Sequence, residues 1–142
     1  MLTETTSKAI LSVIVLLHFV GNVWHGDAHA TLEVALPDYK SAYVGVVIVV
    51  GPIVGAVLAW TRYFLSGYWT IAACMLGSVL FSVYHHFVMV SDDNVHFLPE
   101  GAPEDHQHFA NSAELIAVLA FAGALFAFYV IGKQAVKKTL AQ

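Results

Sequence analysis

Charged side chains are scarce in this chain. They make up 11% of its 142 residues, whereas a typical soluble domain carries about 25%. Only six residues are Lys or Arg, too few to neutralise a phosphate backbone, which excludes nucleic acid as a partner. The single cysteine, Cys74, excludes an internal disulfide scaffold. Motifs for covalent haem attachment, phosphate-binding loops and HExxH zinc chemistry are also missing.

Hydrophobic residues, by contrast, make up 58% of the chain. A helix needs about 20 apolar residues to cross the hydrocarbon core of a bilayer. Four stretches meet this requirement: residues 8–24 (or to 29), 42–60, 69–90 and 109–131. We therefore predict an all-α integral membrane protein, a single domain over residues 1–142 that forms a four-transmembrane-helix bundle and contacts the lipid bilayer.

The distribution of basic residues predicts the orientation of the bundle. With four spans both termini lie on one side, and that side receives five of the six basic residues: Lys8, Arg62, Lys133, Lys137 and Lys138. The positive-inside rule then makes both termini cytoplasmic and the loops 26–40 and 91–108 extracytoplasmic. Ala28-His29-Ala30 resembles a signal-peptidase site, but His18 and Asn22 are unusual in a signal core, so we expect a retained first span.

Histidine is the most distinctive residue type, with eight copies. Under this topology every histidine falls in the outer half of the bundle or in the outer loops. In the first span His18, Asn22, His25 and His29 fall within about 60° of arc if the helix continues past Trp24. In the third span Cys74, Ser78, Ser82, His85 and Met89 share one face, with His86 at its edge. In the fourth, Asn111 and Glu114 share a face beside His108. We expect these stripes to point into the bundle, because lipid cannot satisfy polar groups.

Small residues in the second and fourth spans predict close helix packing. Four-residue spacings of small residues allow two helix backbones to approach each other. The predicted packing positions are Gly51, Gly55, Ala59, Ala117, Ala120 and Ala124.

The histidines predict a transition-metal site, because imidazole is a ligand for copper, zinc and iron. The candidate ligands are His18, His25, His29, His85, His86, His106, His108 and Glu114. Copper is favoured over iron or zinc, since Met89 supplies sulfur on the His85 stripe. Supporting positions are Asn22, Asp27, Ser82, Met89 and Asn111. Asp92 and Asp93 are interpreted as solvated loop residues.

Two alternatives remain open from the sequence. One is a b-type haem held by His18 and either His85 or His86. The other is a non-catalytic subunit of a larger membrane complex or homo-oligomer, whose His-rich loops contact other subunits. The sequence leaves open whether the site is catalytic.

Overall fold

The computed structural model describes residues 2–139, and every regular element within them is a helix. The elements are α1 (Glu4–Thr31), α2 (Asp38–Tyr43), η1 (Val44–Val50), α3 (Gly51–Ala59), α4 (Phe64–Val83), η2 (Tyr84–Val88) and α5 (Pro103–Thr139). α2, η1 and α3 run on as one helix, as do α4 and η2, so the described residues contain four helices long and apolar enough to cross a membrane. The predicted helical fold is confirmed to that extent; Met1 and residues 140–142 lie outside the described part.

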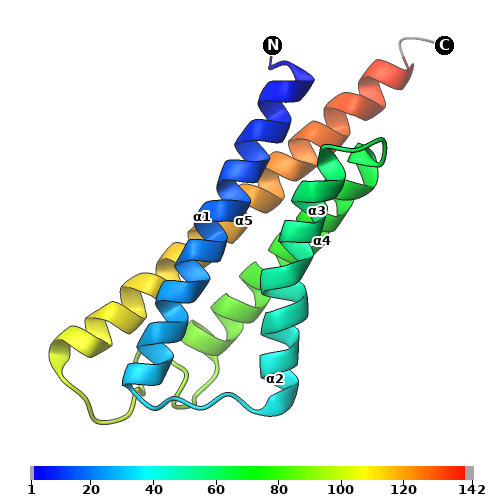
Figure 1. The fold of residues 1–142 in the computed structure, drawn as a ribbon. Coiled ribbons are helices and arrows are strands. Elements are labelled where there is room, and N and C mark those ends of the chain that lie inside the picture. The colour runs from blue at the N-terminus through cyan, green and yellow to red at the C-terminus, as the bar shows by residue number, and fades with distance from the viewer. Residues whose placement is uncertain (1, 140–142) are drawn as a thin grey trace.

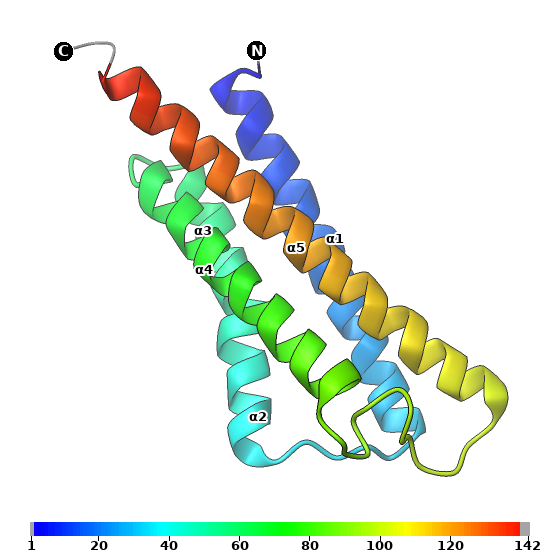
Figure 2. The ribbon, with the colours of Figure 1, turned by 180° about the vertical axis from the view of Figure 1, so that it is seen from behind.

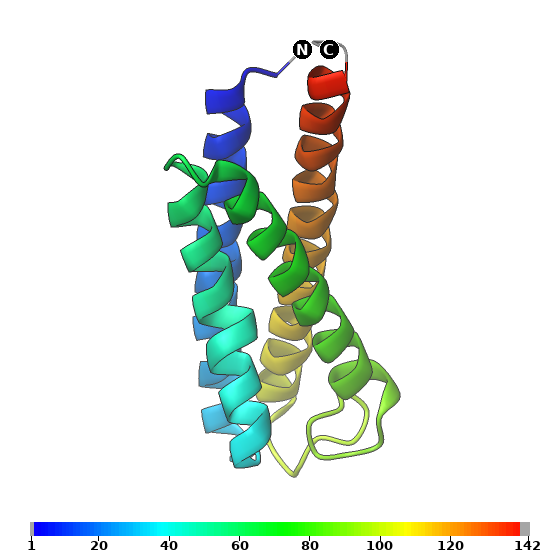
Figure 3. The ribbon, with the colours of Figure 1, turned by 90° about the vertical axis from the view of Figure 1, so that its right-hand side faces the viewer.

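The helices form a bundle with two distinct ends. α5 packs along both α1 and α4, and α3 packs along α4. The start of α1, the end of α5 and the α3–α4 connection lie at one end, and the other two connections lie at the opposite end (Figures 1 and 2). We call this opposite end the loop end. The helices run side by side along the long axis of the molecule (Figure 3).

Helix α1 extends beyond the apolar stretch, residues 8–24, that was predicted to cross the membrane. Thr3 caps its start, because the Thr3 hydroxyl accepts a hydrogen bond from the Thr6 amide at 3.1 Å. The helix continues to Thr31, so His25 and His29 lie on consecutive turns, as the helical spacing requires. Glu33 then adopts a left-handed backbone (φ 54°), which turns the chain back and lets the Val34 amide donate to the His29 carbonyl at 2.9 Å.

α3 and α4 approach each other closely through glycines. A Cβ at Gly55 would lie 2.7 Å from Ile71 Cγ1, and a Cβ at Gly67 would lie 2.5 Å from the Ala59 backbone nitrogen. Such separations leave no room for a side chain, so the two backbones pack directly together. Gly51 makes a similar contact, since its Cβ would meet the Cys74 sulfur at 2.4 Å.

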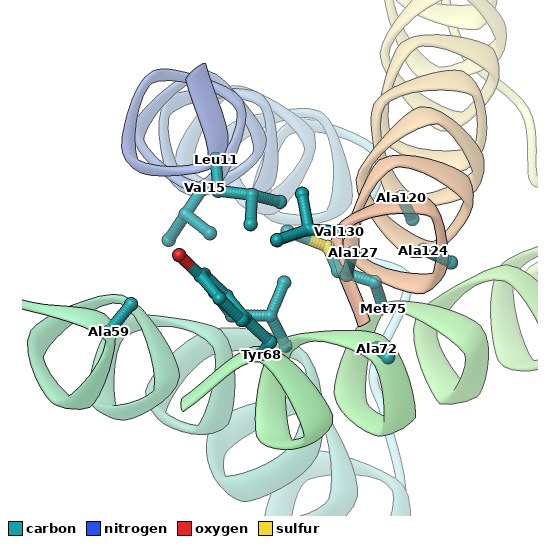
Figure 4. Close-up of a cluster of buried hydrophobic side chains, with 11 residues drawn as sticks. Leu11, Val15, Ala59, Tyr68, Ala72, Met75, Ala120, Ala124, Ala127 and Val130 are labelled. Carbon is teal, nitrogen blue, oxygen red and sulfur yellow. The ribbon is translucent and has the colours of Figure 1, made fainter. Parts of the chain in front are cut away.

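The larger apolar core fills the half of the bundle nearer the termini. Its buried residues come from four helices: Leu11, Val15, Ala59, Tyr68, Ile71, Ala72, Met75, Ala120, Ala124, Ala127 and Val130 (Figure 4). The small alanines of α5 leave the volume that Tyr68 and Met75 occupy. A second, smaller cluster lies at the loop end and comprises Ala28, Leu32, Val34 and Phe109.

Helix α4 changes its winding before it ends. In η2 the hydrogen bonds close π-helical turns, as in the Met89 amide donating to the Tyr84 carbonyl at 2.7 Å. A π turn holds one residue more than an α turn, which shifts the residues that follow around the helix axis. The inward face of α4, marked by Ser78 and Ser82, therefore continues to His86, which is 3% exposed. The sequence pattern placed His85 there, because it assumed α-helical spacing throughout.

Candidate metal centre

Three histidines meet at the loop end of the bundle. His25 and His29 come from adjacent turns of α1, and His86 comes from η2. The Nε2 atoms of His25 and His29 lie 3.2 Å apart, and those of His25 and His86 also lie 3.2 Å apart. We call these three residues the histidine triad. Among the described residues they form the one group of three or more potential ligands placed closely enough to hold a metal ion.

The hydrogen bonds of the triad fix the tautomer of each ring. His29 Nδ1 lies 3.0 Å from the Val34 carbonyl oxygen, and His86 Nδ1 lies 2.8 Å from the Asp93 carbonyl oxygen. A carbonyl only accepts, so both Nδ1 atoms carry the proton and donate. His25 Nδ1 lies 2.9 Å from Ser112 Oγ.

The Ser112 hydroxyl donates a hydrogen bond to the preceding turn of α5. It donates to the His108 carbonyl oxygen at 2.8 Å, and therefore accepts from His25 Nδ1–H. All three neutral rings thus present an Nε2 lone pair to the same point. Three imidazole nitrogens directed at one region are a ligand set that a transition-metal ion can bind.

The spacing of the three nitrogens suits a metal ion. Metal–nitrogen bonds of about 2.05 Å in tetrahedral geometry place the ligand nitrogens about 3.3 Å from each other. Two of the three separations, both involving His25, are 3.2 Å and agree with that spacing, and all three ligand atoms lie within 4.8 Å of one another. Three histidine ligands leave at least one coordination position free, an arrangement typical of catalytic rather than purely structural zinc sites.

A buried carboxylate lies beside the triad. Asp93 is 4% exposed, and its Oδ1 is 3.3 Å from His29 Nε2 and 3.2 Å from His86 Nδ1. Its Oδ2 is 3.6 Å from Lys40 Nζ, which is also buried. Burial alone would raise the pKa of Asp93, but the hydrogen bond from His86 Nδ1–H and the positive charge of the Lys40 ammonium hold the pKa below its usual range. Asp93 therefore carries its negative charge at neutral pH.

The triad is held from two further sides. The Phe109 ring is fully buried, with its centroid 4.7 Å from that of His25 and 4.9 Å from that of His29. The loop that carries Asp93 is braced by Asn94, whose side-chain amide donates to the Met89 carbonyl at 2.8 Å. These contacts limit the movement of the rings, which is what a preorganised ligand set requires.

Comparisons with protein-family models, with curated proteins and with solved structures found no match to this chain. The assignment of the site therefore depends on its geometry.

The remaining candidate histidines lie apart from the triad. His18 is buried one turn below Asn22, and its Nε2 is 3.0 Å from Ser78 Oγ. His85 packs on Phe81, with ring centroids 4.4 Å apart. The two histidines in the first turns of α5 are also separate: His106 Nε2 donates to the Pro99 carbonyl at 2.9 Å, and His108 stacks on Trp24.

Several inward placements predicted from the sequence are corrected. Glu114 and Asn111 are exposed on α5, because the face of α5 that packs inward is the one carrying Ser112, Ala113 and Ile116. Asp27, which was expected to support the ligands of the first span, is exposed. The sulfur-bearing residues also lie elsewhere, since Met89 is 37% exposed and Cys74 packs against Gly51.

Three residues of the site were not identified from the sequence. Asp93 was interpreted as solvated, yet it is buried against Lys40. Ser112 and Phe109 carried no distinguishing signal, although they lie three residues apart on α5 and hence on one helix face. The one available clue was Lys40, the single basic residue in the two loops that the positive-inside rule predicts to be extracytoplasmic.

We expect Asp93→Asn to lower metal affinity by about 10- to 100-fold, the range found for residues that orient metal ligands. The substitution removes the negative charge beside the triad and leaves the Lys40 ammonium without its partner. Affinity is measured by competition with a chelator. Asp92→Asn is the matched control, because Asp92 is the adjacent carboxylate and is exposed. Equal losses in the two variants would contradict a specific role for Asp93.

Proposed function

We propose that this protein is a multi-pass membrane protein that binds one transition-metal ion at the histidine triad. The observation that carries the proposal is the convergence of three Nε2 atoms whose partner Nδ1 atoms all donate to fixed acceptors. Asp93 supplies a negative charge that offsets the charge of the ion. The four apolar, span-length helices support placement in a membrane.

Copper and zinc are the ions that best fit the donor set. Imidazole nitrogen suits both, and at a site of given geometry divalent copper binds more tightly than zinc or iron. The sequence pattern favoured copper because it predicted a sulfur ligand. That argument does not apply, because Met89 and Cys74 lie away from the triad. We therefore propose copper on the affinity order of the imidazole donors, with zinc as the competing ion.

A b-type haem fits the geometry less well. The haem alternative pairs His18 with His85 or His86. His18 Nε2 already lies 3.0 Å from Ser78 Oγ, and His85 packs on the Phe81 ring. His86 Nε2 lies 3.2 Å from His25 Nε2 within the triad. The cavity beside the triad measures about 270 Å³, which lies below the usual range of about 300–1,000 Å³ for small-molecule sites. A haem macrocycle needs a larger opening between the helices.

A fixed site is favoured over a path through the membrane. The interior between the triad and the termini is filled by the larger apolar core, which includes Leu11, Tyr68 and Met75. Apolar side chains offer no ligands to a desolvated ion. A metal held at the triad is therefore expected to enter and leave by the loop end.

The test is elemental analysis of the detergent-purified protein, combined with its absorption spectrum. We expect about one equivalent of copper or zinc per chain after loading and removal of loose ions, with no Soret band. A Soret band with stoichiometric iron would replace this proposal by the haem alternative. Wild-type protein that retains no metal after loading would overturn the proposal.

We further propose that the loop end is extracytoplasmic. Lys8, Arg62, Lys133 and Lys137 belong to the other end, and the exception, Lys40, is buried against Asp93. In a Cys74→Ser background, we expect Phe97→Cys to react with a membrane-impermeant maleimide in intact cells, because residue 97 is half exposed in the loop. Thr61→Cys, in the α3–α4 connection, is expected to react only after lysis. The reverse pattern would invert the orientation.

A further inference from the structure

A cavity borders the histidine triad. It measures about 270 Å³, and all three triad residues and Asp93 form part of its wall. The opposite wall is apolar and is contributed by three other segments, with Ile48 from η1, Phe81 from α4 and Ile116 from α5. The cavity therefore has a polar side, where the metal ligands lie, and an apolar side.

A cavity of this size admits a small organic molecule. An apolar cavity of about 150 Å³ is large enough for benzene, so this one can take a single ring with short substituents. Ser82 also lies in the wall, fully buried, and its hydroxyl has no hydrogen-bond partner in the described structure. An unsatisfied buried hydroxyl is costly, and a ligand with a polar atom would relieve that cost.

The cavity lies where two helices separate. α1 packs against α3, but toward the loop end α2 and η1 lean away from α1 (Figure 1). Gly26, on the α1 side of the cavity, is exposed, and a Cβ there would meet no atom within 4 Å. The cavity wall therefore reaches the molecular surface beside Gly26, which offers a small molecule a way in.

We propose that this cavity binds a small, mainly apolar molecule that places one oxygen or nitrogen atom on the metal held by the triad. The inference deepens the proposed function and depends on it, because the metal supplies the polar contact. The free coordination position left by three histidine ligands accepts the donor atom. The apolar wall formed by Ile48, Phe81 and Ile116 holds the rest of the molecule.

The test uses the purified protein loaded with Co²⁺, whose visible bands respond to a change of ligand. The probe is 4-methylphenol, a single ring with one hydroxyl, and azide serves as a second ligand that needs no cavity. In wild-type protein we expect both probes to shift the bands saturably. Ile48→Phe fills the cavity, and we expect it to weaken 4-methylphenol binding at least tenfold while azide binding and metal content stay unchanged.

A matched control accounts for partition of the probe into the detergent. Val46→Phe lies on the same helix segment but is 66% exposed, so we expect wild-type binding of both probes. Gly26→Val narrows the cavity from the α1 side and repeats the test independently of Ile48.

The possible failures are distinguishable. Wild-type protein that takes up no metal overturns the proposed function and this inference together. Full metal loading without any response to 4-methylphenol, or an equal response in wild type and in both cavity variants, overturns the inference alone.

Discussion

His86→Ala is expected to abolish stoichiometric metal binding, whereas His85→Ala leaves it intact. His86 supplies one of the three converging Nε2 atoms, and His85 packs on Phe81 outside the triad. Complete four-ligand zinc sites contribute about 10–16 kcal/mol, so one imidazole accounts for roughly 3 kcal/mol and its loss lowers affinity at least about hundredfold. The measurement is metal content after dialysis against a weak chelator.

The two variants control for each other. They change the same residue type at neighbouring positions of one π-helical segment, so a general effect on folding or expression would appear in both. His25→Ala is expected to behave like His86→Ala, and His18→Ala like His85→Ala. Loss of metal in His85→Ala with retention in His86→Ala would mean that η2 is wound as an ordinary α-helix and that the triad is misassigned.

Gly67→Ala is expected to destabilise the bundle by about 3 kcal/mol or more, at the upper end of the range for overpacking. The added Cβ would lie 2.5 Å from the Ala59 nitrogen and 2.6 Å from the Gly55 carbonyl oxygen. Both are backbone atoms, so no side-chain rotation relieves the clash and α3 must move away from α4. The measurement is the midpoint of thermal or denaturant unfolding in detergent.

Gly45→Ala provides the comparison. Gly45 also lies within a helical segment, but a Cβ there would meet no atom within 4 Å. Since alanine favours a helix over glycine by roughly 0.5–1 kcal/mol, we expect Gly45→Ala to be neutral or slightly stabilising. A Gly67→Ala variant as stable as Gly45→Ala would contradict the close α3–α4 contact.

The helices and two of the metal ligands follow from local sequence pattern. The length of the apolar stretches located the four spans. The four-residue spacing of His25 and His29 placed them on adjacent turns of one helix. These features depend on residues within about 20 positions of one another. The packing of Gly55 and Ala59 against α4 follows similarly from the spacing of small residues.

The rest of the site depends on features that a periodic pattern does not contain. The choice of His86 over His85 results from π-helical winding, which changes the angle per residue. The burial of Asp93 results from the fold of the loop after η2 and from its pairing with Lys40, which is distant in sequence. The polar stripe shared with Asn111 predicts Glu114 inside the bundle, yet α5 packs inward through Ser112, Ala113 and Ile116 and leaves Glu114 exposed.

The pairing of Lys40 with Asp93 also determines the electrostatic character of the loop end. Lys40 is the basic residue of that end, and its charge is buried and offset. The exposed ionisable groups of this end are then mainly carboxylates: Asp27, Glu33, Asp38, Asp92, Glu100 and Glu104. Such a surface attracts cations and repels anions over the Debye length of about 10 Å at 0.1 M salt. The rate of cation capture by this protein should therefore fall as ionic strength rises, even where the affinity of the site itself does not change.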